Sequence, residues 1–248
     1  MTSGAAVGLA DPTVYPVEER VGEDILQRWI VELLRPLVER WLARSGSSGA
    51  SQAWFVGADQ FIYYRQYDPK RSVAPDLYVL PGVPGGTRVR AWKTWETGIV
   101  PSFALEIVSQ DWEKDYRESP HRYAEVGTSE FVLYDLDWQK HPDGVKFQRF
   151  LRGAENDGEG GFGPPQRTQG DRIESRVLGC FLREVSTQRG LRLRLGSGPS
   201  GDELFPTAEE AERQATEAQR QATEAQRQAT EAALARIAEL EEALRSRK

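Results

Sequence analysis

The sequences APDLYVL at residues 74–80 and FALEIV at residues 103–108 say most about the fold class of this chain. Each is an apolar run of strand length that carries one acidic residue, Asp76 in the first and Glu106 in the second. A carboxylate inside an apolar strand costs free energy unless another group compensates its charge. Two such strands that pair in one sheet can direct both carboxylates at one point, where a divalent cation would neutralise them. The two runs therefore predict a metal site between neighbouring strands.

The segments around these two strands predict a mixed α/β domain. Residues 21–44 carry apolar side chains at helical spacing, and Pro36 is expected to kink that helix. A second helix is predicted at residues 116–126, where Gly127 ends it. Residues 103–108 form the most apolar strand, which is expected at the centre of the sheet. The other predicted strands lie at residues 53–56, 60–67, 77–80, 130–136, 146–151, 173–185 and 191–195, with a surface loop at 153–165.

The C-terminal segment repeats a unit of seven residues that starts at Gln214 and recurs at Gln221 and, in altered form, at Gln228. Thr207 and Glu210 have the spacing of a capping box and predict the start of a helix. Its alanines follow one another at alternating steps of four and three, which makes a stripe of small residues. Two interpretations stay open: the helix forms a homodimer or binds a protein partner through this stripe, or it is a solvated tail.

These features divide the 248 residues into a disordered N-terminus at 1–14, a mixed domain at 15–200 and a helical coiled-coil tail at 201–248. No apolar run approaches a membrane span or the core of a signal peptide, so we expect a cytoplasmic protein without membrane contact. The net charge of -6 disfavours a basic face for nucleic acid. A nucleic-acid substrate would have to be bound through a local cleft and a metal.

The remaining metal-binding and nucleophilic residue types point to structural roles. Cys180 is the single cysteine and lies in an apolar run, which favours a buried thiol. His121 and His141 lack the spacing of a zinc site. Trp92 and Trp95 could stack on bases, but their spacing favours packing at a sheet edge. The carboxylates are therefore the only chemical evidence for catalysis.

The order of these motifs carries a resemblance. The two acidic strands, the sequence YAEVG at 123–127 and the strand EFVLYD at 130–135 together resemble the Uma-type restriction endonucleases, a bacterial family of the PD-(D/E)XK nuclease superfamily. The resemblance extends from about Tyr15 to the tail. It implies a restriction-endonuclease-like αβββαβ core with extra strands. It also implies an endonuclease that hydrolyses phosphodiester bonds in DNA and depends on Mg²⁺ or Mn²⁺.

The resemblance also implies roles for individual residues. Asp76 and Glu106 would hold the metal, with the backbone carbonyl of Ile107 as a further ligand. The metal would polarise the phosphodiester and lower the pKa of a bound water. A lysine should assist, but the two positions at which the superfamily and the family place it hold Val108 and Ser119. The chain therefore departs from the pattern at the catalytic amine.

Lys114 is the nearest substitute for the missing amine. In a regular helix it would point about 140° away from Ser119, so reaching the cleft requires an irregular segment before Pro120. The alternative is a solvated surface lysine that pairs with Asp111 or Glu118. Arg122 is a further candidate, although a guanidinium cannot act as a base.

A third acid could come from Glu23 or Asp24, although acids at a helix start more often serve the helix dipole. Tyr123 could line the cleft or belong to the core, and Ser109 could contact a metal ligand or cap a loop.

Three hypotheses stay open at this point. The first is a metal-dependent DNA endonuclease, which the paired acids support. The second is a degenerate nuclease fold kept as a binding or regulatory module, which the missing lysine and the acidic charge support. The third is an adaptor that recruits a partner through the tail. Because a fold does not fix a function, only the site can decide among them.

Overall fold

The computed structural model describes residues 13–14, 25–45, 53–153, 161–188 and 190–246. The predicted disorder at residues 1–14 lies almost wholly outside these residues, and the candidate acids Glu23 and Asp24 lie outside them as well. The chain divides into two compact units, Met1–Phe205 and Pro206–Lys248, and each is described by itself. The predicted domain limits at residues 14 and 200 stay predictions.

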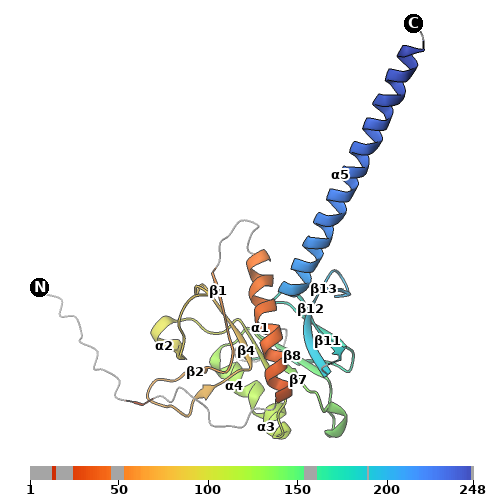
Figure 1. The fold of residues 1–248 in the computed structure, drawn as a ribbon. Helices are drawn as coiled ribbons and strands as arrows, with labels where there is room; N and C mark the ends of the chain where they lie inside the picture. The colour runs from red at the N-terminus through yellow and green to blue at the C-terminus, as the bar shows by residue number, and fades with distance from the viewer. Residues whose placement is uncertain (1–12, 15–24, 46–52, 154–160, 189, 247–248) are drawn as a thin grey trace, which may run out of the picture. The chain divides into compact units, whose positions relative to one another are not determined.

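The first unit is built on a six-stranded sheet with the order β1-β4-β6-β7-β8-β9 (Figure 1). Its central strand β6 pairs antiparallel with β4 and parallel with β7. The chain order of α1, β1, β4, β6, α3 with α4, and β7 gives the αβββαβ core, so the predicted fold class is confirmed. The strands are β1 (Trp54–Gly57), β4 (Leu77–Pro81), β6 (Phe103–Ile107), β7 (Glu130–Tyr134), β8 (Phe147–Leu151) and β9 (Gln166–Thr168).

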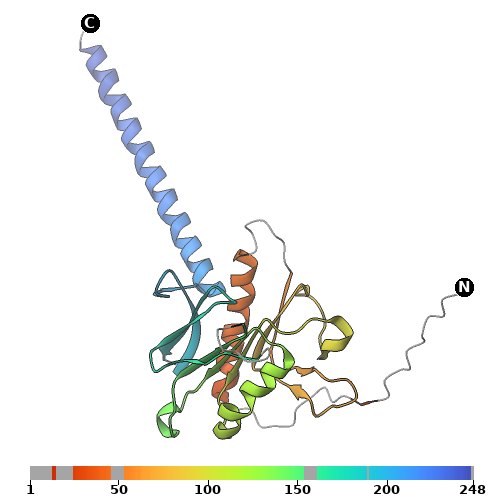
Figure 2. The same cartoon turned by 180° about the vertical axis from the view of Figure 1, so that it is seen from behind.

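Helices cover both faces of this sheet (Figures 1 and 2). The long helix α1 (Ile25–Ser45) packs on one face, together with a second sheet, through a core that includes Leu34, Leu105 and Leu182. On the opposite face, α4 (Ser119–Val126) packs through Tyr123 onto Phe131 of β7, with ring centroids 4.1 Å apart. The sheet is therefore buried on both faces, as a strand with parallel neighbours requires.

Two smaller sheets complete the first unit. One has the order β3-β2-β5 and the other β10-β11-β12-β13. Their strands are β2 (Phe61–Tyr63), β3 (Ser72–Val73), β5 (Ala91–Lys93), β10 (Arg172–Ser175), β11 (Cys180–Thr187), β12 (Gly190–Ser197) and β13 (Glu203–Leu204). The short helices are α2 (Thr94–Thr97), α3 (Trp112–Arg117) and the 3-10 turn η2 (Trp138–Lys140).

Three predicted elements were wrong in extent. The strand predicted at 60–67 stops at Tyr63, because the chain turns back into β3. The strand predicted at 173–185 is two strands, β10 and β11, joined by a turn in which Gly179 has a φ of 67°. The helix predicted at 116–126 is two helices that meet at Glu118. Pro120 explains the last break, since it has no N–H to donate to the preceding turn.

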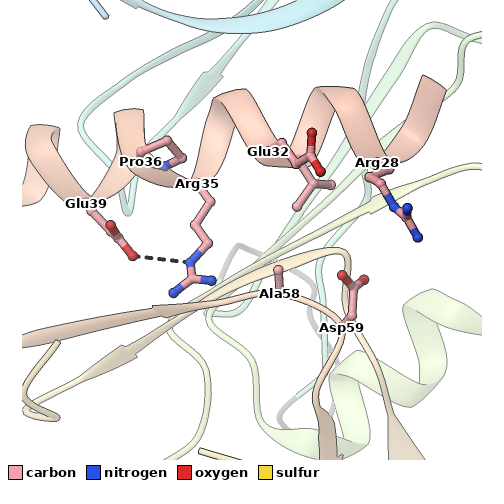
Figure 3. Close-up of a pocket in the computed structure, with 8 residues that line it drawn as sticks. Arg28, Glu32, Arg35, Pro36, Glu39, Ala58 and Asp59 are labelled. Carbon is pink, nitrogen blue, oxygen red and sulfur yellow. Dashed lines mark hydrogen bonds and ion pairs between the residues drawn. The ribbon is translucent and has the colours of Figure 1, made fainter. Parts of the chain in front are cut away.

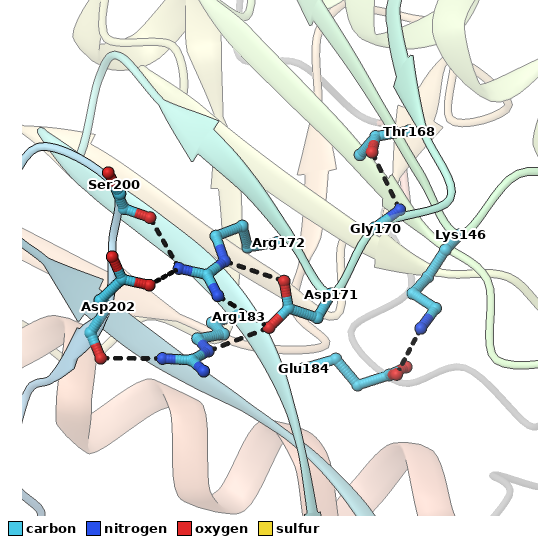
Figure 4. A network of polar contacts seen from close by, with 9 residues as sticks. All are labelled: Lys146, Thr168, Gly170, Asp171, Arg172, Arg183, Glu184, Ser200 and Asp202. Carbon is cyan, nitrogen blue, oxygen red and sulfur yellow. Dashed lines mark hydrogen bonds and ion pairs between the residues drawn. The ribbon is translucent and has the colours of Figure 1, made fainter.

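A network of arginines and aspartates ties the second sheet together (Figure 4). Asp171 accepts hydrogen bonds from Arg172 at 2.8 Å and from Arg183 at 3.1 Å, and these cations lower the pKa of its carboxyl group. Arg172 also donates to Asp202 at 2.6 Å. Cys180, in the same sheet, is a buried free thiol, and burial raises its pKa to about 12. The expected structural role of the cysteine is confirmed.

The second unit is the helix α5 (Ala208–Arg245). It starts at the predicted capping box, in which Glu210 N–H donates to Thr207 Oγ1 at 3.1 Å and Thr207 N–H donates to Glu210 Oε2 at 2.8 Å. Ion pairs along the helix, such as Arg220 with Glu217 at 2.9 Å, stabilise it locally. Leu240, in the last part of the helix, is half exposed, so its side chain is accessible to solvent. Pairing with a second copy or a protein partner stays a prediction.

None of the helices described is both long enough and apolar enough to cross a membrane.

Gly57 permits a close approach that shapes the strand next to Asp76. Gly57 of β1 pairs with Tyr78 of β4, and a Cβ at Gly57 would lie 2.2 Å from the Tyr78 ring. That ring is fully buried, and its hydroxyl donates to Gln60 at 2.9 Å, so it cannot move aside without loss. We expect Gly57→Ala to destabilise the fold by about 1–3 kcal/mol and to lower the melting temperature by several degrees.

Thermal unfolding followed by circular dichroism measures this effect. Gly86→Ala is the matched control, because a Cβ there meets no atom within 4 Å. If both variants melt at the wild-type temperature, the close packing of Tyr78 over Gly57 is wrong.

Candidate functional site

The pairing of β4 and β6 brings the two predicted acids together. The antiparallel register places Leu77 opposite Leu105, so one step further Asp76 lies opposite Glu106. Asp76 directly precedes β4 and Glu106 is the fourth residue of β6. The prediction that Asp76 lies inside the strand was wrong by one residue. Because side chains alternate along a strand, Glu106 points to the same face as Ala104, which α4 covers.

Asp76 is held by the backbone of the neighbouring strand. Its Oδ2 accepts a hydrogen bond from Ile107 N–H at 2.6 Å. Burial raises the pKa of Asp76 well above its ordinary value, this hydrogen bond opposes the shift, and the charge of Glu106 adds to it. One carboxylate oxygen is thus fixed by the sheet, and the other accepts no hydrogen bond from the residues that the structure describes.

Glu106 is held by the helix above it. Tyr123 donates its hydroxyl proton to Glu106 Oε1 at 2.9 Å, and the Ser119 side chain forms a further hydrogen bond with the carboxylate. Burial raises the pKa of Glu106 to about 7, even though these hydrogen bonds and the charge of Lys114 lower it. Of the two roles open for Tyr123, the structure shows both, since its ring is core and its hydroxyl contacts the candidate site.

Both carboxylates line one pocket of about 740 Å³. Ile107, Lys114, Ser119 and Arg122 line it too, so the structure brings together every described residue that the sequence singled out for the reaction. Among the residues that the structure describes, the wall holds four acids and four cations. The acids are Asp59, Asp76, Glu106 and Asp115, and the cations are Arg28, Lys70, Lys114 and Arg122. Acids and cations are therefore equal in number in the described part of the wall.

The break between α3 and α4 decides where Lys114 lies. The two helices meet at Glu118, so Lys114 and Ser119 face the same pocket although one regular helix would turn them apart. The alternative ion pair of Lys114 with Asp111 or Glu118 is not formed among the described residues, where Glu118 instead pairs with Arg122 at 3.1 Å. Ser119 is buried, and it occupies the position at which the family pattern expects the amine.

Gln27 and Asp115, both on the pocket wall, are among the residues that the sequence analysis missed. Gln27 of α1 donates from Nε2 to the carbonyl oxygens of Ile107 at 3.3 Å and Val108 at 3.4 Å. Asp115 is buried and accepts from both the N–H and the hydroxyl of Ser109, each at 2.7 Å. These partners are far apart in the chain or follow from the helix break, so no local pattern indicates them. Ser109 therefore caps the loop through Asp115 and forms no hydrogen bond with Asp76 or Glu106 among the described residues.

A second pocket of about 560 Å³ adjoins the first along α1, and Arg28 and Asp59 line both (Figure 3). Arg35 projects into it but forms an ion pair with Glu39 at 3.2 Å. In the described part of its wall, three acids, Glu32, Glu39 and Asp59, outnumber the two arginines. A phosphate group is therefore disfavoured on this side of the site.

The donor set fits a small divalent cation. Among the described residues, no group of three or more His, Cys, Asp or Glu side chains is arranged to hold one metal ion. The remaining set is two carboxylates and the Ile107 carbonyl, all oxygen ligands on one pocket wall. Mg²⁺ in proteins is commonly bound through one or two carboxylates and keeps several waters. Burial raises the pKa of both acids, and the charge of a bound cation would oppose that shift.

Comparisons with known proteins show the family of the chain. The model of the Uma2 family, described as "Putative restriction endonuclease", matches residues 17–178. Among solved structures, a crystal structure from Anabaena variabilis described as a "putative nuclease" is similar, with a TM-score of 0.39 and 13% sequence identity over 62% of this chain and 72% of that chain. No curated protein matches the chain.

Proposed function

Because the chain belongs to the Uma2 family of restriction-endonuclease-like proteins, we propose that it is a nuclease that hydrolyses phosphodiester bonds in DNA with the help of Mg²⁺ or Mn²⁺. The observation that carries the proposal is the position of Asp76 opposite Glu106 on the wall of a pocket that also holds four cations. Buried acids beside cations suit a ligand that is itself anionic and that arrives with a metal.

The residues of the pocket have separate roles in this proposal. Asp76, Glu106 and the carbonyl of Ile107 would hold the cation. When bound, the cation supplies charge stabilisation at the phosphoryl group and a water of lowered pKa. Tyr123 and Ser119 fix the orientation of Glu106, and their hydrogen bonds keep its carboxylate from rotating away from Asp76.

Cations on the pocket wall would bind the substrate. Lys114 is exposed and near enough to Glu106 to lower its pKa, so its ammonium can reach a phosphate oxygen held above the carboxylates. There it would stabilise the negative charge that develops during hydrolysis. Arg122 also lines the pocket, and its guanidinium, which pairs with the exposed Glu118 at 3.1 Å, would exchange this partner for a neighbouring phosphate of the strand.

The test is a titration of the purified protein with Mg²⁺ or Mn²⁺, followed by thermal unfolding, with cleavage of plasmid and oligonucleotide DNA in the same buffers. We expect metal to raise the melting temperature, because a ligand that binds only the folded state stabilises it. Cleavage should start with the metal and stop with a chelator. If metal neither stabilises the protein nor supports cleavage, the degenerate nuclease fold and the adaptor are the hypotheses that remain.

A further inference from the structure

The hairpin between β2 and β3, residues 64–71, borders the candidate site and has no role in the function proposed above. Phe61, Lys70 and Ser72 place its two ends on the wall of the pocket that holds Asp76 and Glu106. It carries three cations, Arg65, Lys70 and Arg71, against the single acid Asp68. In a chain of net charge -6, this is a local excess of positive charge beside the site.

The hairpin is an ordered element. Its strands pair through Tyr63 and Ser72, Tyr64 N–H donates to the Arg71 carbonyl at 3.1 Å, and Arg71 N–H donates to the Asp68 carbonyl at 3.0 Å. Its base is tied to α4, since Tyr64 and Arg71 both donate to Glu125, at 3.2 and 3.1 Å. The same helix holds Tyr123, so the hairpin and the carboxylates share one support.

Tyr67, in the turn of this hairpin, is in an unusual state. It has a φ of 65°, in the left-handed region, and its side chain is 61% exposed. A bulky residue is rarely found in this region, where glycine or asparagine would cost less. Most of the side chain nevertheless faces solvent. Backbone strain of this kind is concentrated at sites that bind ligands.

We infer that the hairpin 64–71 binds an unpaired stretch of the nucleic-acid substrate, with the Tyr67 ring stacked on a base and Arg65 and Lys70 on the flanking phosphates. This rests on the proposed function and names its substrate class. An exposed aromatic ring among cations is the combination that binds single strands, because every base offers a face for stacking. In a duplex the bases already stack on each other, so the ring could reach a base only after local unstacking.

The charge of the pocket walls supports this direction. On the α1 side the acids outnumber the arginines, and Arg35 is committed to Glu39. In the first pocket, Lys70 of the hairpin and Lys114 line the wall, and Arg122 is committed to Glu118 at 3.1 Å. A strand whose phosphate lies over Asp76 and Glu106 is therefore attracted toward the hairpin.

The experiment measures binding of short fluorescent oligonucleotides to the full chain, without divalent metal so that nothing is cleaved. Single-stranded DNA, single-stranded RNA and duplex DNA are the three probes. We expect Tyr67→Asn to weaken single-strand binding by about 5- to 150-fold, the range that matches the loss of one stacked base. Tyr67→Phe should keep the affinity, since the ring remains. Tyr67→Asn should melt no lower than wild type, because asparagine tolerates the left-handed region.

The cations are tested through the salt dependence of binding. Lys70→Gln should reduce the slope of log affinity against log salt by about 0.7, the effect of one phosphate contact on a single strand. Arg167→Gln is the control, since Arg167 is an exposed cation on the edge strand β9 and should leave the slope unchanged.

Single-strand affinity that is indifferent to Tyr67→Asn, or duplex bound more tightly than single strands, overturns the inference. Its failure is distinct from failure of the proposed function. If the protein cleaves DNA and Tyr67→Asn binds single strands as tightly as the wild type does, only this inference is wrong. If the protein binds single strands through Tyr67 but cleaves no DNA, only the proposed hydrolysis is wrong. The DNA and RNA probes show which sugar the site accepts.

Discussion

Asp76→Asn and Glu106→Gln are each expected to abolish stabilisation by Mg²⁺ or Mn²⁺ and to reduce DNA cleavage by at least about 100-fold. Charge stabilisation by a bound metal is worth several kcal/mol, and each 1.36 kcal/mol is about a factor of ten in rate. An amide keeps the shape of each acid but removes its charge. The amide oxygen that Asp76→Asn introduces could still accept the hydrogen bond from Ile107 N–H, so the fold should survive.

The same two substitutions should stabilise the metal-free protein. The folded pKa of Glu106 is about 7, above its ordinary value of 4.5, so the folded state holds a proton that the unfolded state releases. Stability of the wild type in a chelator should therefore fall as the pH rises from about 4.5 through 7. The loss is on the order of 2 kcal/mol, because Glu106 is partly exposed and solvent screening reduces the full value of the shift.

Denaturant unfolding at a series of pH values in a chelator measures this. Glu106→Gln should show a smaller decline than the wild type, since Asp76 still contributes to it, and should exceed the wild type in stability above pH 7. Glu113→Gln is the control, because Glu113 is an exposed acid of α3 outside the pocket wall. If the amide variants bind metal and cleave DNA as the wild type does, the two carboxylates have no role in metal binding or cleavage.

Lys114→Ala is expected to reduce cleavage by about 10²- to 10³-fold while leaving metal binding in place. Loss of one group that stabilises developing charge has an effect of this size. The substitution removes an exposed side chain that pairs with neither Asp111 nor Glu118 among the described residues, so stability should change little. Arg117→Ala, an exposed cation of the same helix that does not line the pocket, is the control.

Ser119→Lys in the Lys114→Ala background completes the test. Ser119 is buried and hydrogen-bonded to Glu106, so a lysine at this position would bring its amine against the carboxylate. We expect partial recovery of cleavage, measured as single-turnover rates with saturating metal. If Lys114→Ala has no effect and Ser119→Lys alone creates activity, the wild-type chain lacks a working amine. It would then be a degenerate nuclease.

Local patterns in the sequence were enough to predict several elements of the fold and the two acids. Asp76 and Glu106 were recognisable because a charge in an apolar strand is costly wherever the strand lies. The central position of β6 followed from its apolar composition, and the start of α5 followed from the capping box of Thr207 and Glu210. These features depend on neighbours in the chain, so a pattern of a few residues predicts them.

What surrounds the two acids depends instead on long-range packing. The hydrogen bonds of Gln27 to Ile107 and Val108 join residues about eighty positions apart. The pocket position of Lys114 depends on a helix break, and the strained turn at Tyr67 lies in a segment whose sequence predicts a strand. Alternating aromatic and polar residues fit a strand and a hairpin equally well. The hairpin is selected by the pairing of Ile62 with Val73 and by the hydrogen bond of Tyr64 to Glu125. Local sequence preference does not contain that information.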